Sequence, residues 1–102
     1  GLSSLLALYH RLRDAGVEDL HPVTHGVAIS LYLRDPEGNR LEIYVDTPWY
    51  VTQPMRVPVN MEQDEAGVMR EVEAHARTLP GFEPLADWQA RIAAVMAAKT
   101  GT

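Results

Sequence analysis

Two histidines and a glutamate are the side chains best suited to bind a metal ion or to move protons. His21 and His25 stand four residues apart in the segment H-P-V-T-H-G, and Glu42 follows among aliphatic residues. Pro22 and Gly26 argue against a helix here, and residues four apart in an extended segment point to the same side. Two imidazoles beside a carboxylate suit metal ligation or proton transfer. The alternative is that both histidines make ordinary structural hydrogen bonds.

Glu42 and Tyr32 each allow a structural and a chemical interpretation. A carboxylate is rarely buried without a partner, because its desolvation is costly. Glu42 is therefore either a solvent-facing strand residue paired with Arg40 or Arg34, or a metal ligand or acid–base group. Spacing alone favours the solvent-facing interpretation. Tyr32 is either a core or cross-strand aromatic, or a hydrogen-bond donor to a bound oxygen ligand.

A β-hairpin is expected to position these side chains. Apolar residues alternate with others over 27–33 and again over 40–46, which is the period of a β-strand. The D-P-E-G-N segment between them is a turn signal, since Pro36 fixes φ and Gly38 can take a positive φ. Aligning the apolar rows pairs Leu33 with Leu41, Leu31 with Ile43, and Ile29 with Val45.

This register decides which side chains share a face of the hairpin. It places Tyr32 opposite Glu42 and Ser30 opposite Tyr44 on one polar face. The other face is aliphatic and should meet a helix. A site is therefore expected on the polar face.

The elements around the hairpin are predicted from apolar spacing and from proline. Helical spacing predicts helices over 2–15, over 64–79 and from 85 to near Gly101. Residues 20–24 are expected to form a short strand, which its proline confines to an edge or to a strand start.

Residues 47–59 contain three prolines and are expected to form an irregular, extended segment. Trp49 and Tyr50 in this segment either wall a pocket for an aromatic ligand or anchor the segment to the core.

Composition limits the class of protein. The 102 residues fit one domain of ordinary globular composition, with 46% apolar and 23% charged residues. The net charge of −5 and the lack of a basic patch argue against a nucleic-acid partner. No apolar run is long enough to span a membrane, and the absence of cysteine fits a reducing compartment. We therefore expect a cytoplasmic protein that binds neither nucleic acid nor membranes.

The stretch from His21 to Asp46 resembles the last half-module of the vicinal-oxygen-chelate superfamily, which includes glyoxalases, bleomycin-resistance proteins and extradiol dioxygenases. The D-P-E-G-N turn followed by L-E-I-Y is typical of the superfamily. The H-x-x-x-H-G segment and the following tyrosine are closer to the extradiol ring-cleaving dioxygenases. The resemblance implies an α+β fold. Residues 1–46 would form a βαβββ module without its first strand (a helix and a three-stranded antiparallel sheet), and residues 47–102 an irregular segment with a two-helix extension.

The resemblance also assigns roles to four residues. Glu42 falls on the carboxylate ligand of the metal, and Tyr32 falls on the tyrosine near the metal-bound substrate. His25, seventeen residues before the glutamate, matches the active-site histidine of single-domain relatives. The H-x-x-x-H-G match instead favours His21 for that role. We rank His25 first.

The implied metal is Fe(II), held by two histidines and one glutamate, with Mn(II), Zn(II) or Ni(II) as alternatives. Each histidine ligand belongs to the first strand of a module, so both are expected upstream of Gly1. The implied activity is cleavage of a catechol-like aromatic diol with O2, in the degradation of aromatic compounds, by a homodimer. The alternatives are a glyoxalase- or isomerase-like metalloenzyme and a non-catalytic protein that binds a small molecule such as a drug.

Overall fold

The computed structural model describes residues 1–99 and has an α+β fold built on one antiparallel sheet. The sheet has the strand order β3-β2-β1-β5. Its strands are β1 (His21–Thr24), β2 (Ala28–Arg34), β3 (Arg40–Asp46) and β5 (Val57–Pro58). The predicted fold class is therefore confirmed. The sheet has one strand more than predicted, because the two residues of β5 come from the segment expected to be irregular.

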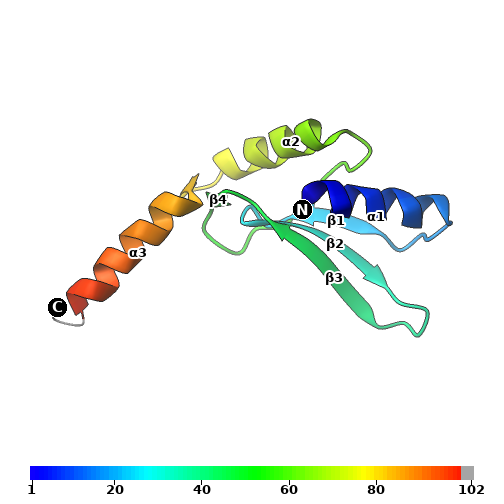
Figure 1. Ribbon diagram of the computed structural model, residues 1–102, viewed down its shortest axis with the longest axis horizontal. Coiled ribbons are helices and arrows are strands. Elements are labelled where there is room, and N and C mark those ends of the chain that lie inside the picture. Colours follow the sequence, from blue (N-terminus) through cyan, green and yellow to red (C-terminus); the bar gives the residue numbers. More distant parts are fainter. Residues whose placement is uncertain (100–102) are drawn as a thin grey trace.

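Two helices, α1 (Leu2–Asp14) and α2 (Glu65–Arg77), lie on the same side of this sheet (Figure 1). Both match the predicted helices to within two residues. The carboxylate of Asp64 accepts a hydrogen bond from the backbone N–H of Gly67 at 2.8 Å. This bond caps the first turn of α2, where backbone N–H groups have no partner within the helix.

The β2–β3 hairpin has the predicted register. Leu31 pairs with Ile43, Tyr32 with Glu42, and Ser30 with Tyr44. The turn forms because the carboxylate of Asp35 accepts hydrogen bonds from the backbone N–H groups two and four residues later, as in an Asx turn. Gly38 takes a φ of 87° there. The polar and aliphatic faces of the hairpin are therefore separated as the alternation predicts.

Strand β1 lies inside the sheet, between β2 and β5. Pro22 is its second residue, and its carbonyl accepts a hydrogen bond from the backbone N–H of Val59 at 3.0 Å. Strand β5 pairs only with Val23 and Thr24. The proline thus stands near a strand start, where its missing N–H removes no ladder bond from the centre of the strand.

The aliphatic face of the sheet packs against both helices. Ile29 and Leu31 of β2 are fully buried there, and burial of each such side chain contributes about 1.5–3 kcal/mol. Their cluster also contains Leu2, Leu5, Leu6, Val59, Met61, Val68 and Val72. The helices cover β3 only in part, since its apolar side chains Leu41 and Ile43 remain partly exposed. The division into residues 1–46 and 47–102 stays a prediction, and residues from both parts contribute to this core.

The C-terminal part is connected to the sheet by a short second sheet of β4 (Trp49–Tyr50) and β6 (Glu83–Pro84). The Tyr50 ring stacks on the Trp88 ring, with centroids 4.5 Å apart and an interplanar angle of 14°. Tyr50 therefore links this segment to the residues that follow β6. Trp49 packs against the main core.

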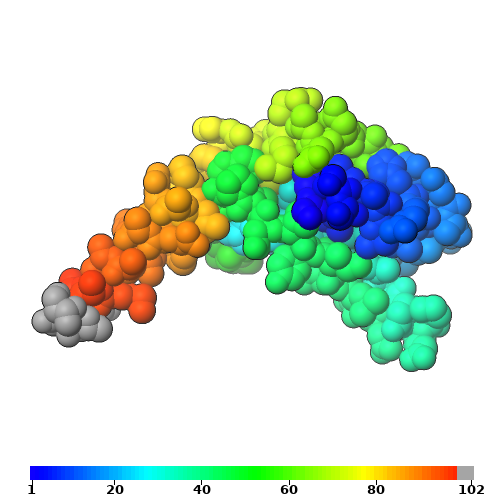
Figure 2. Space-filling model, viewed as in Figure 1, coloured from blue at the N-terminus to red at the C-terminus, as the bar shows by residue number. Residues whose placement is uncertain are grey.

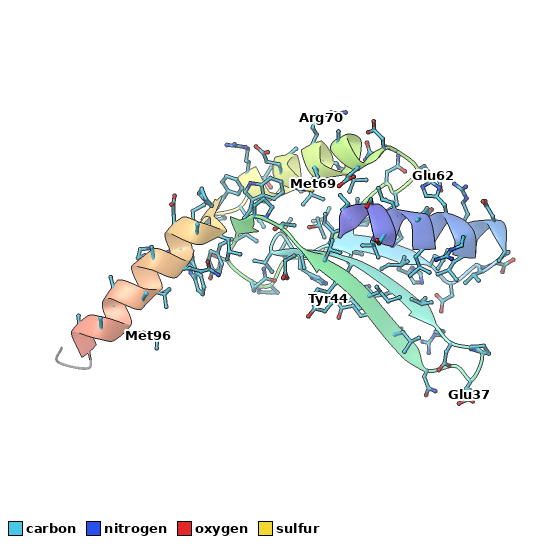
Figure 3. All side chains as sticks on the ribbon, viewed as in Figure 1. Glu37, Tyr44, Glu62, Met69, Arg70 and Met96 are labelled. Carbon is cyan, nitrogen blue, oxygen red and sulfur yellow. The ribbon has the colours of Figure 1, made fainter. Side chains whose placement is uncertain are left out.

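Helix α3 (Leu85–Lys99) projects from the body of the molecule (Figures 1 and 2). The radius of gyration is 16.3 Å, against about 13 Å for a compact domain of 100 residues. The exposed side chain of Met96 stands on this projecting helix (Figure 3). The predicted end of the helix near Gly101 lies outside the described residues.

Candidate functional site

The sheet face opposite the helices carries the polar side chains. Tyr44 projects from β3 on this side, away from α1 (Figure 3), and is exposed. Side chains two residues apart on a strand share a face, so Glu42 lies beside Tyr44 on β3. Ser30 and Tyr32 lie on the same face of β2 by their pairing with these two residues. This is the face on which the sequence predicts a site.

His25 lies just after β1 and is held from several sides. Its ring Nδ1 is 2.8 Å from the backbone carbonyl oxygen of Met55. A carbonyl oxygen only accepts hydrogen bonds, so Nδ1 carries the proton. In the neutral ring Nε2 is then an acceptor, and the hydroxyl of Tyr32, 2.9 Å away, donates to it. The side-chain amide of Gln53 donates to the backbone carbonyl of His25 at 2.8 Å. The backbone around the ring thus selects one tautomer.

Glu42 lies beside the His25–Tyr32 pair. Its Oε2 accepts a hydrogen bond of 2.8 Å from the hydroxyl of Ser30 and is 3.9 Å from His25 Nε2. The Glu42 side chain is 39% exposed, so the carboxylate is held by the protein and is also accessible from outside. Arg34, one of two arginines considered as its partner, binds Asp19 at 3.2 Å instead.

Tyr32 has an altered acidity in this environment. Burial raises the pKa of Tyr32 above its usual 10.0, and the adjacent Glu42 carboxylate raises this pKa further. The positive charges of Arg56 and Arg40 act in the opposite direction. Tyr32 is therefore a protonated hydrogen-bond donor at neutral pH, as the bond to His25 requires.

We expect the Glu42→Gln variant to lower the pKa of Tyr32 towards the usual value, because a neutral amide no longer disfavours the phenolate. Spectrophotometric titration of tyrosinate measures this pKa, with Tyr32→Phe identifying its contribution among the four tyrosines. The pKa of Tyr32 is higher in the folded protein than in the unfolded chain, so the folded state favours the protonated phenol. The stability that Tyr32 contributes in this way is complete below pH 10.0, the usual pKa of tyrosine, and is lost as pH rises through the pKa of the folded protein. An unchanged Tyr32 titration in Glu42→Gln would contradict this.

His21 lies at the edge of the site. It pairs with Tyr32 in the β1–β2 register, but its ring Nε2 binds Asp19 at 2.5 Å. Its side chain is 57% exposed, against 23% for His25. The structure therefore brings His25, Tyr32 and Glu42 together and leaves His21 outside their hydrogen-bonded cluster. The catalytic roles of His25, Tyr32 and His21 stay predictions, as does the metal-ligand role of Glu42.

A pocket of about 380 Å³ adjoins the site, which is within the usual range of small-molecule sites, about 300–1,000 Å³. His21 and Arg56 line it together with Leu20, Pro22, Val23 and Pro58. The guanidinium carbon of Arg56 is 4.8 Å from the centre of the Tyr32 ring, within the range of a cation–π contact. The pocket thus reaches the edge of the site on the side of Tyr32.

Three contributors to the site were not predicted from the sequence, namely Gln53, the carbonyl of Met55, and Arg56. All three belong to the proline-containing segment 47–59. Such a segment has no periodicity from which the direction of a side chain follows. Their role became visible only from the tertiary fold.

Gly26 sets the path of the chain next to His25, and we expect Gly26→Ala to be strongly destabilising. Its φ is 78°, and an added Cβ would overlap Val51 and lie within 2.9 Å of the Met55 sulfur. The positive φ costs about 1–2 kcal/mol, and the overlap adds about 1–3 kcal/mol. Gly38→Ala is the matched control, since its φ is 87° and no atom lies within 4 Å of the new Cβ. Denaturant unfolding giving equal losses for both variants would refute the packing argument.

The chemistry of Glu42 fits one ligand position for a divalent metal. Carboxylate oxygen is a common ligand, and two histidines with one carboxylate form the usual iron site of non-haem oxygenases. Within residues 1–99, no three His, Cys, Asp or Glu side chains gather closely enough to hold a metal ion.

Two curated proteins are similar to part of this chain. Biphenyl-2,3-diol 1,2-dioxygenase 3 of Rhodococcus globerulus is 51% identical over 45 residues, which is 44% of this chain and 24% of that protein. Biphenyl-2,3-diol 1,2-dioxygenase 2 of the same organism is 42% identical over 60 residues, or 56% of this chain and 32% of that protein. The matches thus span about a quarter to a third of each relative.

No family model matches the sequence, and no solved structure gives a significant match. Within the described residues, no helix has the length and apolar character needed to cross a membrane.

Proposed function

We propose that the intact protein is a metal-dependent extradiol dioxygenase that cleaves the ring of an aromatic 1,2-diol. The observation that carries this proposal is the hydrogen bond between Tyr32 and His25 beside the Glu42 carboxylate. A proton acceptor, a hydroxyl donor and a candidate metal ligand thus lie together on an accessible face. The similarity to two biphenyl-2,3-diol dioxygenases supports the same reaction class.

The residues of the chain would handle protons and orientation. His25 Nε2 is the acceptor for a proton from a hydroxyl of the diol, because Nδ1 is already bound to the Met55 carbonyl. Tyr32, whose hydroxyl points at that nitrogen, would donate a hydrogen bond to an oxygen atom of the substrate or of O2. The Arg56 charge near the Tyr32 ring favours an anionic form of the bound diol.

Glu42 would hold Fe(II) as one of three protein ligands. Bound Fe(II) would lower the proton affinity of the two diol oxygens and permit reaction with O2. In the balanced reaction one ring carbon–carbon bond next to the diol breaks, and both atoms of O2 enter the product. The two histidine ligands, and the homodimer that we expect, stay predictions.

Oxygen consumption tests the proposed function. The intact protein is loaded with Fe(II) without air and then mixed with aerated biphenyl-2,3-diol or catechol. We expect uptake of O2 and a coloured ring-opened product, whereas an aromatic 1,3-diol serves as a non-chelating control. An iron-loaded protein that consumes no O2 with any 1,2-diol of a panel would reject the proposal.

A further inference from the structure

Ser30 is a buried hydroxyl in the middle of β2 and has a specific partner across the hairpin. It is fully buried, as are its neighbours Ile29 and Leu31, although it faces the opposite side of the sheet from them. A buried hydroxyl needs a hydrogen-bond partner, whereas alanine in this place would need none. The partner is Glu42, whose Oε2 lies 2.8 Å from the Ser30 hydroxyl.

The register shows that this bond is diagonal. Ser30 lies directly opposite Tyr44, and Glu42 lies two residues before Tyr44 on the same face. To accept the bond, the Glu42 side chain must lean along β3 towards Tyr44 instead of reaching straight across the hairpin. In this orientation the Oε2 atom of Glu42 lies 3.9 Å from His25 Nε2. A hydrogen bond to an ionised carboxylate is about twice as strong as one between neutral groups, so it favours this orientation of Glu42.

We propose that Ser30 is a positioning residue that fixes the Glu42 carboxylate in the orientation in which it binds the metal. This inference rests on the proposed function. A half-exposed glutamate on an outer strand otherwise has several accessible rotamers, and metal binding would have to order it. Ser30 orders the side chain before the metal arrives. Because Ser30 is fully buried and its hydroxyl bonds to Glu42, it would act on the metal through Glu42.

The test is the affinity of the intact protein for Fe(II), measured without air by competition with a ferrous chelator. Ser30→Ala is expected to raise the dissociation constant about 10–100-fold, the usual effect of removing a group that orients a metal ligand. The thermal unfolding of the metal-free variant should change little, because water can replace the lost hydroxyl at this half-exposed carboxylate. Ser30→Thr keeps a hydroxyl and is expected to restore most of the affinity. Ser30→Cys keeps the volume with a weak donor and should resemble Ser30→Ala.

Thr47→Val is the matched control. Thr47 is also a buried hydroxyl, but it donates to the Gly26 carbonyl and not to Glu42. We expect this variant to lower the unfolding temperature and to leave the iron affinity unchanged. If it weakens iron binding as much as Ser30→Ala does, Ser30 has only a structural role and the inference is overturned.

The Glu42→Gln variant separates the two proposals. If Glu42→Gln loses iron while Ser30→Ala binds it like the parent protein, the positioning role is wrong and the proposed function stands. If Glu42→Gln retains iron at parental affinity, Glu42 is not a ligand, and both the ligand assignment and the role of Ser30 fail.

Discussion

Replacing Glu42 with glutamine is expected to weaken Fe(II) binding to the intact protein by at least about 100-fold, because loss of groups that only orient a ligand already costs about 10–100-fold. Glutamine has nearly the same shape as glutamate, so the packing around Ser30 and Tyr32 is kept. What is lost is the negative charge that favours a divalent cation. Metal analysis after equilibration with Fe(II) gives the occupancy, and the oxygen uptake should fall with it.

Glu37→Gln is the matched control for this charge change. Glu37 stands at the tip of the hairpin turn, far along the hairpin from Tyr44 (Figure 3), and is exposed. The variant removes the same charge from the same hairpin and should keep both iron and activity. Equal iron loss in the two variants would show that net charge, and not the position of Glu42, governs binding.

His25→Gln is expected to lower kcat about 10²–10⁴-fold, the usual contribution of a positioned acid–base group, with iron binding retained. Glutamine can occupy the space of the ring, but its amide cannot accept a proton at neutral pH and pass it on. The variant therefore lacks the proton acceptor of the parent protein, the His25 Nε2 atom that lies 2.9 Å from the Tyr32 hydroxyl. Steady-state oxygen uptake together with metal analysis separates this loss of rate from a loss of metal.

His21→Gln is the control that decides between the two histidines. His21 binds Asp19 at the rim and lies outside the cluster around Tyr32, so its replacement should leave kcat nearly unchanged. A change in KM alone would fit its place in the adjoining pocket. If His21→Gln had the larger loss in kcat, the ranking of His25 over His21 would be reversed.

The hairpin and the composition of its polar face could be predicted from the sequence. Strict alternation over two strands admits one register in which the aliphatic rows match, and Leu31 pairs with Ile43 as this requires. The pairing of Tyr32 with Glu42 followed from the same argument. Helix α1 and helix α2 were predictable because each carries one apolar stripe.

The detail of the site could not be predicted in the same way. The diagonal bond from Ser30 to Glu42 depends on a rotamer, and the contact of His25 with the Met55 carbonyl joins residues 30 positions apart. Strand β5 has only two residues, too few to show an alternating pattern. Spacing alone favours a solvent-facing Glu42, and the resemblance implies its metal-ligand role. The fold adds what neither could give, namely the contacts of its carboxylate with Ser30 and His25.

Labelled oxygen tests the central claim most directly. The iron-loaded intact protein is supplied with biphenyl-2,3-diol and with O2 in which both atoms are a heavy isotope, and the product is examined by mass spectrometry. An extradiol dioxygenase gives a ring-opened product that carries both labelled atoms, one of which can exchange with water, so short reaction times are compared. A diol recovered intact, or a ring-opened product without any label at the shortest times, would contradict the proposed function.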